Sequence, residues 1–133
     1  MNGNDPPQKI RTKRLRILVV DDDRPVAEAI AAELDDCDVV VAESGQEVLA
    51  LIGRDAAFDV VLCDVMMPDM TGMEVHEGIR VVEPALASRI VFMTGGAFTT
   101  QAREFLSTVG NTSIEKPFSA DALRAMLGRL VGD

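Results

Sequence analysis

The sequence is poor in basic residues. Its 13 lysines and arginines stand against 22 aspartates and glutamates, which gives a formal net charge of −9. Direct binding to nucleic acid depends on clustered Lys and Arg side chains that neutralise phosphates. We therefore expect no nucleic acid as a direct partner. Five of the 13 basic residues do gather within residues 9–16, and we interpret this cluster as part of a solvated linker.

Long apolar runs are also missing. No stretch approaches the roughly 20 apolar residues that a membrane-spanning helix needs, and residues 1–5 do not have the pattern of a signal peptide. We expect a cytoplasmic protein with no direct membrane contact. The two cysteines, Cys37 and Cys63, lack the spacing of a metal site, so we interpret both as free thiols in a reducing cytoplasm.

The length of 133 residues suits a single domain with a real core. Residues 1–14 contain Pro6-Pro7 and much of the basic cluster, and we predict that they form a flexible tail or linker. Residues 15–133 then form the folded domain.

Short apolar runs alternate with helical patterns along the folded domain. The runs predict strands at residues 17–20, 38–42, 60–63, 89–93 and 112–115. Residues suited to begin helices stand between and after them: Ser44 and Thr71, each with a glutamate three residues on, Thr99 or Thr100, and Ser119. Five such β–α units predict an α/β fold, a doubly wound five-stranded parallel sheet with five helices on its two faces.

Polar residues stand where four of these strands end. Asp21 and Asp22 follow the first strand, Asp64 the third, Thr94 the fourth and Lys116 the fifth. In open parallel sheets the ligand site lies beyond the carboxyl ends of the strands, where the strand order reverses. If the order is 2-1-3-4-5, the acids converge at one place.

The chemistry of these residues suggests a metal-dependent phosphoryl acceptor. Three nearby carboxylates repel one another unless a cation lies among them. An all-oxygen site with no His or Cys at hand suits Mg²⁺ better than zinc. Asp64 could then act as a nucleophile and form an acyl phosphate. The Lys116 ammonium, the Thr94 hydroxyl and nearby N–H groups could stabilise the phosphoryl oxygens.

Residues 15–131 resemble a response-regulator receiver domain of two-component signalling. The resemblance rests on four motifs in the family's order and spacing: Ile17-Leu18-Val19-Val20-Asp21-Asp22, Asp64-Val65-Met66-Met67-Pro68 with Gly72, Val91-Phe92-Met93-Thr94, and Lys116-Pro117-Phe118. It implies a flavodoxin-like fold with a cis Lys116–Pro117 bond. It also implies a self-catalysed phosphoacceptor in a phosphorelay rather than an enzyme, with weak or no self-association.

The resemblance assigns a role to each site residue. Asp64 is the phosphoacceptor, loaded by a histidine kinase or a histidine phosphotransfer protein. Mg²⁺ is bound directly by Asp22, Asp64 and the backbone carbonyl of Met66, while Asp21 acts largely through water. Thr94 is the switch hydroxyl, and Lys116 binds the phosphoryl group.

Two positions depart from the family's usual pattern. Ser113 stands where an aromatic residue usually moves with the switch threonine, and Gly95-Gly96 follow Thr94 where alanine is common. Since Ser113 is too small for the usual role, we expect the backbone of residues 94–99 to carry the response to phosphorylation, followed by the surface of the adjoining helix and last strand.

Three other functions can be compared with this one. A haloacid-dehalogenase-type phosphatase needs a second Asp where this chain has Met66, and a dinucleotide-binding domain needs a glycine-rich turn where it has Asp21-Asp22-Asp23. A degenerate receiver that only binds proteins is the alternative. The chain could be a stand-alone receiver or the carboxyl-terminal receiver of a hybrid sensor histidine kinase, which would itself be an enzyme; the motifs around Thr94 and Lys116 favour the hybrid origin.

Overall fold

A computed structural model describes residues 14–95 and 99–131. Its centre is a sheet of five parallel strands in the order β2-β1-β3-β4-β5, which confirms the predicted topology. The strands are β1 (Arg16–Val20), β2 (Asp38–Ala42), β3 (Val60–Asp64), β4 (Ile90–Thr94) and β5 (Ser113–Glu115). The predicted tail falls almost entirely on residues 1–13, outside the described residues.

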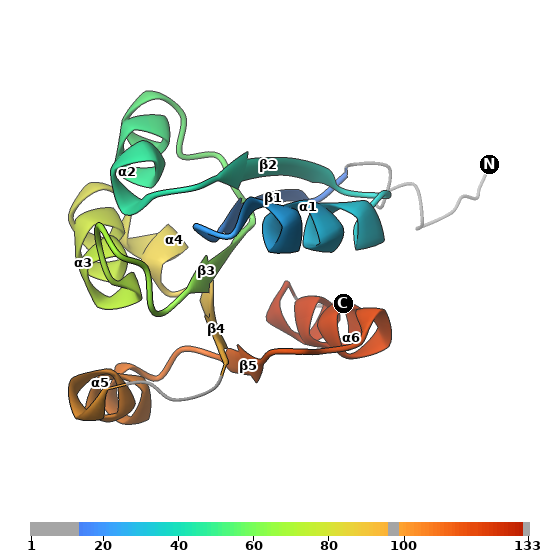
Figure 1. Cartoon of the computed structure of the whole chain (residues 1–133). Coiled ribbons are helices and arrows are strands. Elements are labelled where there is room, and N and C mark those ends of the chain that lie inside the picture. The colour runs from blue at the N-terminus through green and yellow to red at the C-terminus, as the bar shows by residue number, and fades with distance from the viewer. Residues whose placement is uncertain (1–13, 96–98, 132–133) are drawn as a thin grey trace.

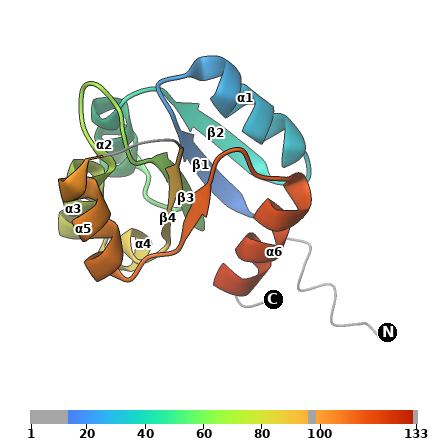
Figure 2. The same ribbon diagram turned by 60° about the horizontal axis from the view of Figure 1, so that its bottom comes forward.

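Helices cover both faces of the sheet (Figures 1 and 2). They are α1 (Arg24–Glu33), α2 (Gly45–Arg54), α3 (Gly72–Val82), α4 (Pro84–Ala87), α5 (Thr100–Val109) and α6 (Ala120–Leu130). Helices α1 and α6 lie on one face, and α2, α3, α4 and α5 lie on the other. Each face therefore has its own apolar core.

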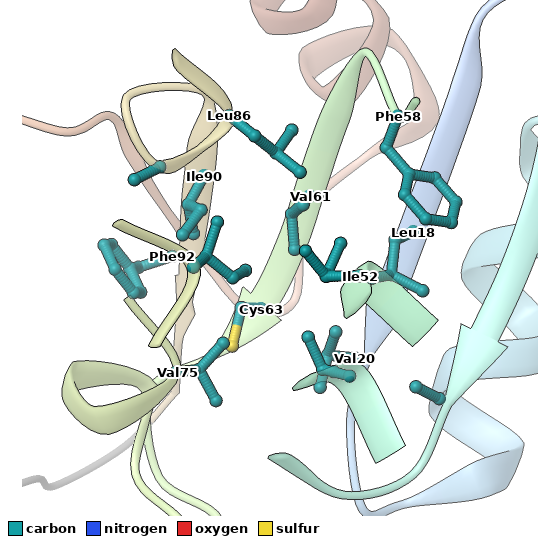
Figure 3. Close-up of a cluster of buried hydrophobic side chains, with 14 of the residues drawn as sticks. Leu18, Val20, Ile52, Phe58, Val61, Cys63, Val75, Leu86, Ile90 and Phe92 are labelled. Carbon is teal, nitrogen blue, oxygen red and sulfur yellow. The ribbon is translucent and has the colours of Figure 1, made fainter. Parts of the chain in front are cut away.

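The strand sequences explain why both faces are covered. Side chains alternate between the faces along a strand, so Leu18 and Val20 enter the core under α2 and α3, while Ile17 and Val19 enter the core under α1 and α6. Figure 3 shows the first of these cores, in which β3 contributes Cys63. Cys63 is buried, Cys37 is half-buried, and both are free thiols, as predicted.

The helix starts follow the predicted capping residues. Ser44, Thr99 and Ser119 each accept a hydrogen bond from a backbone N–H in the first turn of their helix, and Thr71 forms a complete capping box with Glu74. The box predicted at Ser44 is only half formed: the Glu47 carboxylate accepts from the backbone N–H of Glu43, 2.9 Å away, and not from that of Ser44. At the other end of α5, Gly110 takes a left-handed conformation with φ 84°.

The prediction of five helices is wrong by one, because the described part of the chain forms six. Glu83 ends α3, and Pro84 begins the single turn of α4, whose Leu86 and Ala87 are buried. Proline suits the first turn of a helix because it needs no N–H partner there. Within residues 14–95 and 99–131, none of these helices combines the length and hydropathy of a membrane span.

Two arginines form contacts at the amino-terminal ends of the strands, opposite to the strand ends that carry the acids. The backbone N–H of Arg16 donates to Asp59 Oδ2 at 2.8 Å, and its guanidinium lies 4.3 Å from the centre of the Phe58 ring. Arg89 Nε donates to the Asp59 carbonyl at 2.7 Å. These contacts tie β1 and the segment before β4 to the start of β3.

Candidate phosphoryl-acceptor site

The predicted site residues follow the carboxyl ends of β1, β3, β4 and β5, which lie along one edge of the sheet. Oxygen atoms of Asp21, Asp22 and Asp64 all lie within 4.8 Å of one another. The structure therefore brings together the three acids that the sequence placed at two strand ends. Lys116 joins them, because its Nζ lies 3.0 Å from Asp21 Oδ2 and 3.6 Å from Asp64 Oδ2.

Asp21 is the most enclosed of the acids, with a relative exposure of 1%. Its backbone N–H donates to the Ala42 carbonyl, and its Oδ1 accepts from the backbone N–H of Asp23 at 2.9 Å. The Lys116 ammonium donates to its other oxygen. Asp22 is exposed, and Asp23 caps α1 instead of joining the cluster.

Asp64 ends β3 with a side chain that is only 12% exposed. Its Oδ1 accepts from the backbone N–H of Met66 at 3.3 Å. Burial raises the pKa of the Asp64 carboxyl above its ordinary value; the Lys116 charge opposes that rise, and the charge on Asp21 adds to it. The carboxylate is therefore only partly compensated by the protein, which is the condition that favours a bound cation or an electrophile.

Backbone contacts of Lys116 itself set where this residue lies. Its N–H donates to the Thr94 carbonyl at 2.6 Å, and its bond to Pro117 is cis, as predicted. Burial lowers the pKa of the ammonium, but the hydrogen bond to Asp21 and the charges of Asp64 and Asp21 outweigh it, so the pKa lies above its usual value. Lys116 is therefore a cation at neutral pH.

The donor set fits a hard divalent cation. The three acids offer carboxylate oxygens from neighbouring positions, and such oxygens are the ligands that Mg²⁺ prefers. One ammonium leaves the charge of three carboxylates incompletely balanced. Met66, the fourth predicted ligand, lies at the start of the β3–α3 loop beside Asp64.

Thr94 is the last residue of β4 and is half-buried. Phe92 lies two residues earlier, on the same face of the strand, and its ring packs edge-on against Phe105 of α5 at 5.3 Å between centroids. Ser113 pairs with Phe92 in the sheet register and is exposed. Aromatic rings thus pack on the face of β4 that Thr94 shares, although neither Phe92 nor Phe105 belongs to β5. Of the predicted switch segment, residues 96–98 lie outside the described residues.

His76 completes this cluster of rings, which sequence reasoning missed. Its half-buried ring lies 5.6 Å from the Phe105 ring and 6.2 Å from the Phe92 ring, measured between centroids. Burial lowers its pKa below the ordinary value. The only sequence signal was its place on α3, one residue after the buried Val75.

Comparisons with known proteins show which family this sequence belongs to. The sequence matches the response regulator receiver domain family over residues 17–128. It is 36% identical over 115 residues to the transcriptional regulatory protein DltR of Streptococcus agalactiae. That alignment covers 85% of this chain and 50% of DltR. It is also 36% identical over 124 residues to the virulence sensor protein BvgS of Bordetella pertussis, covering 88% of this chain and 10% of BvgS.

A solved structure gives the same result for the fold. The chemotaxis protein CheY4 of Vibrio cholerae superposes with a TM-score of 0.75 at 29% identity, covering 89% of this chain and 99% of that one. The chain spans half the length of DltR and a tenth of BvgS, so the likeness concerns one domain of those proteins. With its five-stranded sheet and its acids at the strand ends, the chain belongs to the family of response-regulator receiver domains.

Proposed function

We propose that the domain accepts a phosphoryl group from a phosphohistidine onto Asp64 in a two-component phosphorelay. The observation that carries this proposal is the position of the Lys116 ammonium, 3.0 Å from Asp21 and 3.6 Å from Asp64 inside the acidic cluster. A purely structural ion pair would need one acid and not three. The surplus of negative charge is explained if a metal ion and a phosphoryl group join the site.

The protein groups then have distinct tasks. An Asp64 oxygen attacks phosphorus, an O–P bond forms, the P–N bond to the donor imidazole breaks, and its electron pair stays with that imidazole. Lys116 neutralises charge on the phosphoryl oxygens, and the Thr94 hydroxyl donates to one of them. Asp21 holds the lysine in place before the donor arrives.

Mg²⁺ would be held by Asp22, Asp64 and the Met66 carbonyl, with Asp21 acting largely through water. When bound, it supplies positive charge that both draws the acids together and offsets the charge of the phosphoryl group.

The phosphoryl donor is a histidine kinase or a histidine phosphotransfer protein, in a separate chain or in the same chain as the receiver. A cavity of about 460 Å³ lies beside Lys116, between α1 and α6. Its walls include Val26, Ile30, Phe118 and Leu123. Its apolar lining and its position next to the acceptor suit a donor helix that presents its phosphohistidine to Asp64.

The test is labelling with acetyl phosphate and with a phosphorylated kinase. We expect one phosphoryl group per chain, no label in excess chelator, and no label on Asp64→Asn. Asp23→Asn is the matched control, because Asp23 neighbours the cluster but caps α1, and asparagine caps equally well. Labelling of Asp64→Asn would exclude the assignment. A parent protein that takes no label would instead favour a protein-binding scaffold.

Thr94 links this chemistry to output. We propose that its hydroxyl and the backbone of residues 94–99 close on the phosphoryl group, since Ser113 cannot supply the usual aromatic partner. A ligand shifts such an equilibrium only through contacts that differ between the states. Hydrogen exchange with and without beryllofluoride should show increased protection at residues 94–99. A change confined to another face would contradict this.

A further inference from the structure

The side chain of Met70 lies directly on the backbone of Gly45. A Cβ placed on Gly45 would come within 2.6 Å of Met70 Cβ, 2.7 Å of its Sδ and 2.9 Å of its Cγ. These distances are far shorter than the 3.5–4.0 Å at which carbon atoms pack. Gly45 is buried and is the first residue of α2, so only glycine fits at this point of the helix.

Met70 belongs to the β3–α3 loop, residues 65–71, which follows Asp64 and includes Met66. Hydrogen bonds fix both ends of this loop. The Met66 N–H donates to Asp64 and the Val65 N–H donates to the Met93 carbonyl. At the far end, Thr71 is held by its capping box.

The middle of the loop is held differently. In the part of the chain that the structure describes, residues 67–70 take part in no hydrogen bond with other protein groups. Pro68 and Asp69 are exposed, whereas Met67 is buried and Met70 is half-buried. Apolar packing by these two methionines therefore sets the position of the segment, and Met70 connects it to the first residue of α2.

We propose that the Met70–Gly45 contact positions the β3–α3 loop for metal binding, which makes Met70 a positioning residue for the acceptor site. This inference rests on the function proposed above. A loop segment without hydrogen bonds can shift relative to the helix it packs on. A shift at Met70 would move Met66, and with it the backbone N–H that donates to Asp64 Oδ1. Outer groups that orient metal ligands typically change metal affinity about 10–100-fold when they are altered.

The chain provides a control contact between α2 and α3, away from the loop. A Cβ on Gly78 of α3 would come within 2.6 Å of Leu49 Cδ2 on α2. Gly78→Ala therefore crowds the packing of α2 against α3, six residues beyond the start of α3. It perturbs helix packing without touching the loop. Met70→Leu conserves volume and should retain the contact, since Leu and Met exchange at low cost.

The experiment measures Mg²⁺ affinity by isothermal titration calorimetry without any phosphoryl donor, alongside thermal unfolding of each variant. Met70→Ala and Gly45→Ala should each weaken Mg²⁺ binding about tenfold. Met70→Leu and Gly78→Ala should bind Mg²⁺ like the parent. Acetyl phosphate labelling of Met70→Ala should need more Mg²⁺ but should reach the parental rate at saturation.

Three results would overturn the inference. Parental Mg²⁺ affinity in Met70→Ala would show that the contact does not position the site. If Met70→Ala does not fold, parental affinity in Gly45→Ala would lead to the same conclusion. Equal weakening in Gly45→Ala and Gly78→Ala would assign the effect to general destabilisation. Failure of the proposed function looks different, because the parent itself would then neither bind Mg²⁺ nor take label.

Discussion

Asp64→Asn should stabilise the protein when no metal is present. The carboxylate gains about 5 kcal/mol from Lys116 at 3.6 Å for an effective dielectric constant of about 20. It loses about 3–4 kcal/mol or more to Asp21, since the two carboxylates lie within 4.8 Å of each other. These contributions nearly cancel, and the cost of burying the charge remains.

The expected gain for Asp64→Asn is therefore about 1–2 kcal/mol in the free energy of unfolding, or about 4–8 °C in the melting temperature. The asparagine can still accept from the Met66 N–H, so that contact is retained. Differential scanning calorimetry in excess chelator measures the difference. Asp23→Asn, which leaves the cluster unchanged, should melt like the parent.

Mg²⁺ should reverse this order. A ligand that binds only the native state stabilises it by about 2.7 kcal/mol at a concentration 100 times its dissociation constant. The parent should gain this amount, while Asp64→Asn, which lacks one ligand carboxylate, should gain much less. Two observations would refute the reasoning: a lower melting temperature for Asp64→Asn in chelator, or an equal response of both proteins to Mg²⁺.

Three further outcomes follow from the same contacts. Lys116→Ala should retain Mg²⁺ binding in calorimetry but take label from acetyl phosphate about 10²-fold more slowly, because the cation aimed at the phosphoryl oxygens is gone; parental labelling would refute this role. Burial lowers the pKa of His76 in the native protein. As the pH falls through about 6.5, this imidazole therefore takes up a proton in the unfolded chain before it does so in the native protein, and the free energy of unfolding decreases. Between about pH 7.5 and about pH 5.5, the free energy of unfolding in urea should fall less for His76→Leu than for the parent. An equal dependence of that free energy on pH in both proteins would contradict the burial of this ring. Thr71→Ala should lower the free energy of unfolding in urea by about 1 kcal/mol, and Thr71→Ser should leave it almost unchanged, because only the first substitution removes the hydroxyl that caps α3. An equal decrease for both variants would exclude the cap as the cause.

Local signals explain why so much of the fold could be predicted. Apolar runs buried on both faces of a parallel sheet are continuous, so strands such as Ile17–Val20 stand out from their surroundings. Capping residues mark helix starts through bonds that span only three residues, as at Thr71. The acidic cluster followed from topology alone, because the carboxyl ends of parallel strands share one edge.

The features that were missed depend on contacts between distant residues or on very short segments. Helix α4 has four residues, too few for a helical period to appear, and it begins at a proline that reads as a stop. The environment of His76 is formed by Phe92 and Phe105, from two other elements. The contact of Met70 with Gly45 likewise joins a loop to the first residue of α2, 25 positions apart in the sequence.

The two edges of the sheet divide the tasks of this domain between them. The edge that carries Asp21, Asp64 and Lys116 holds the charged groups of the proposed acceptor site, whereas the opposite edge carries Arg16 and Arg89 bound to Asp59. Substitutions at well-separated sites usually act additively. Substitutions that strengthen the arginine edge should therefore raise the abundance of this receiver without changing the proposed phosphoryl chemistry.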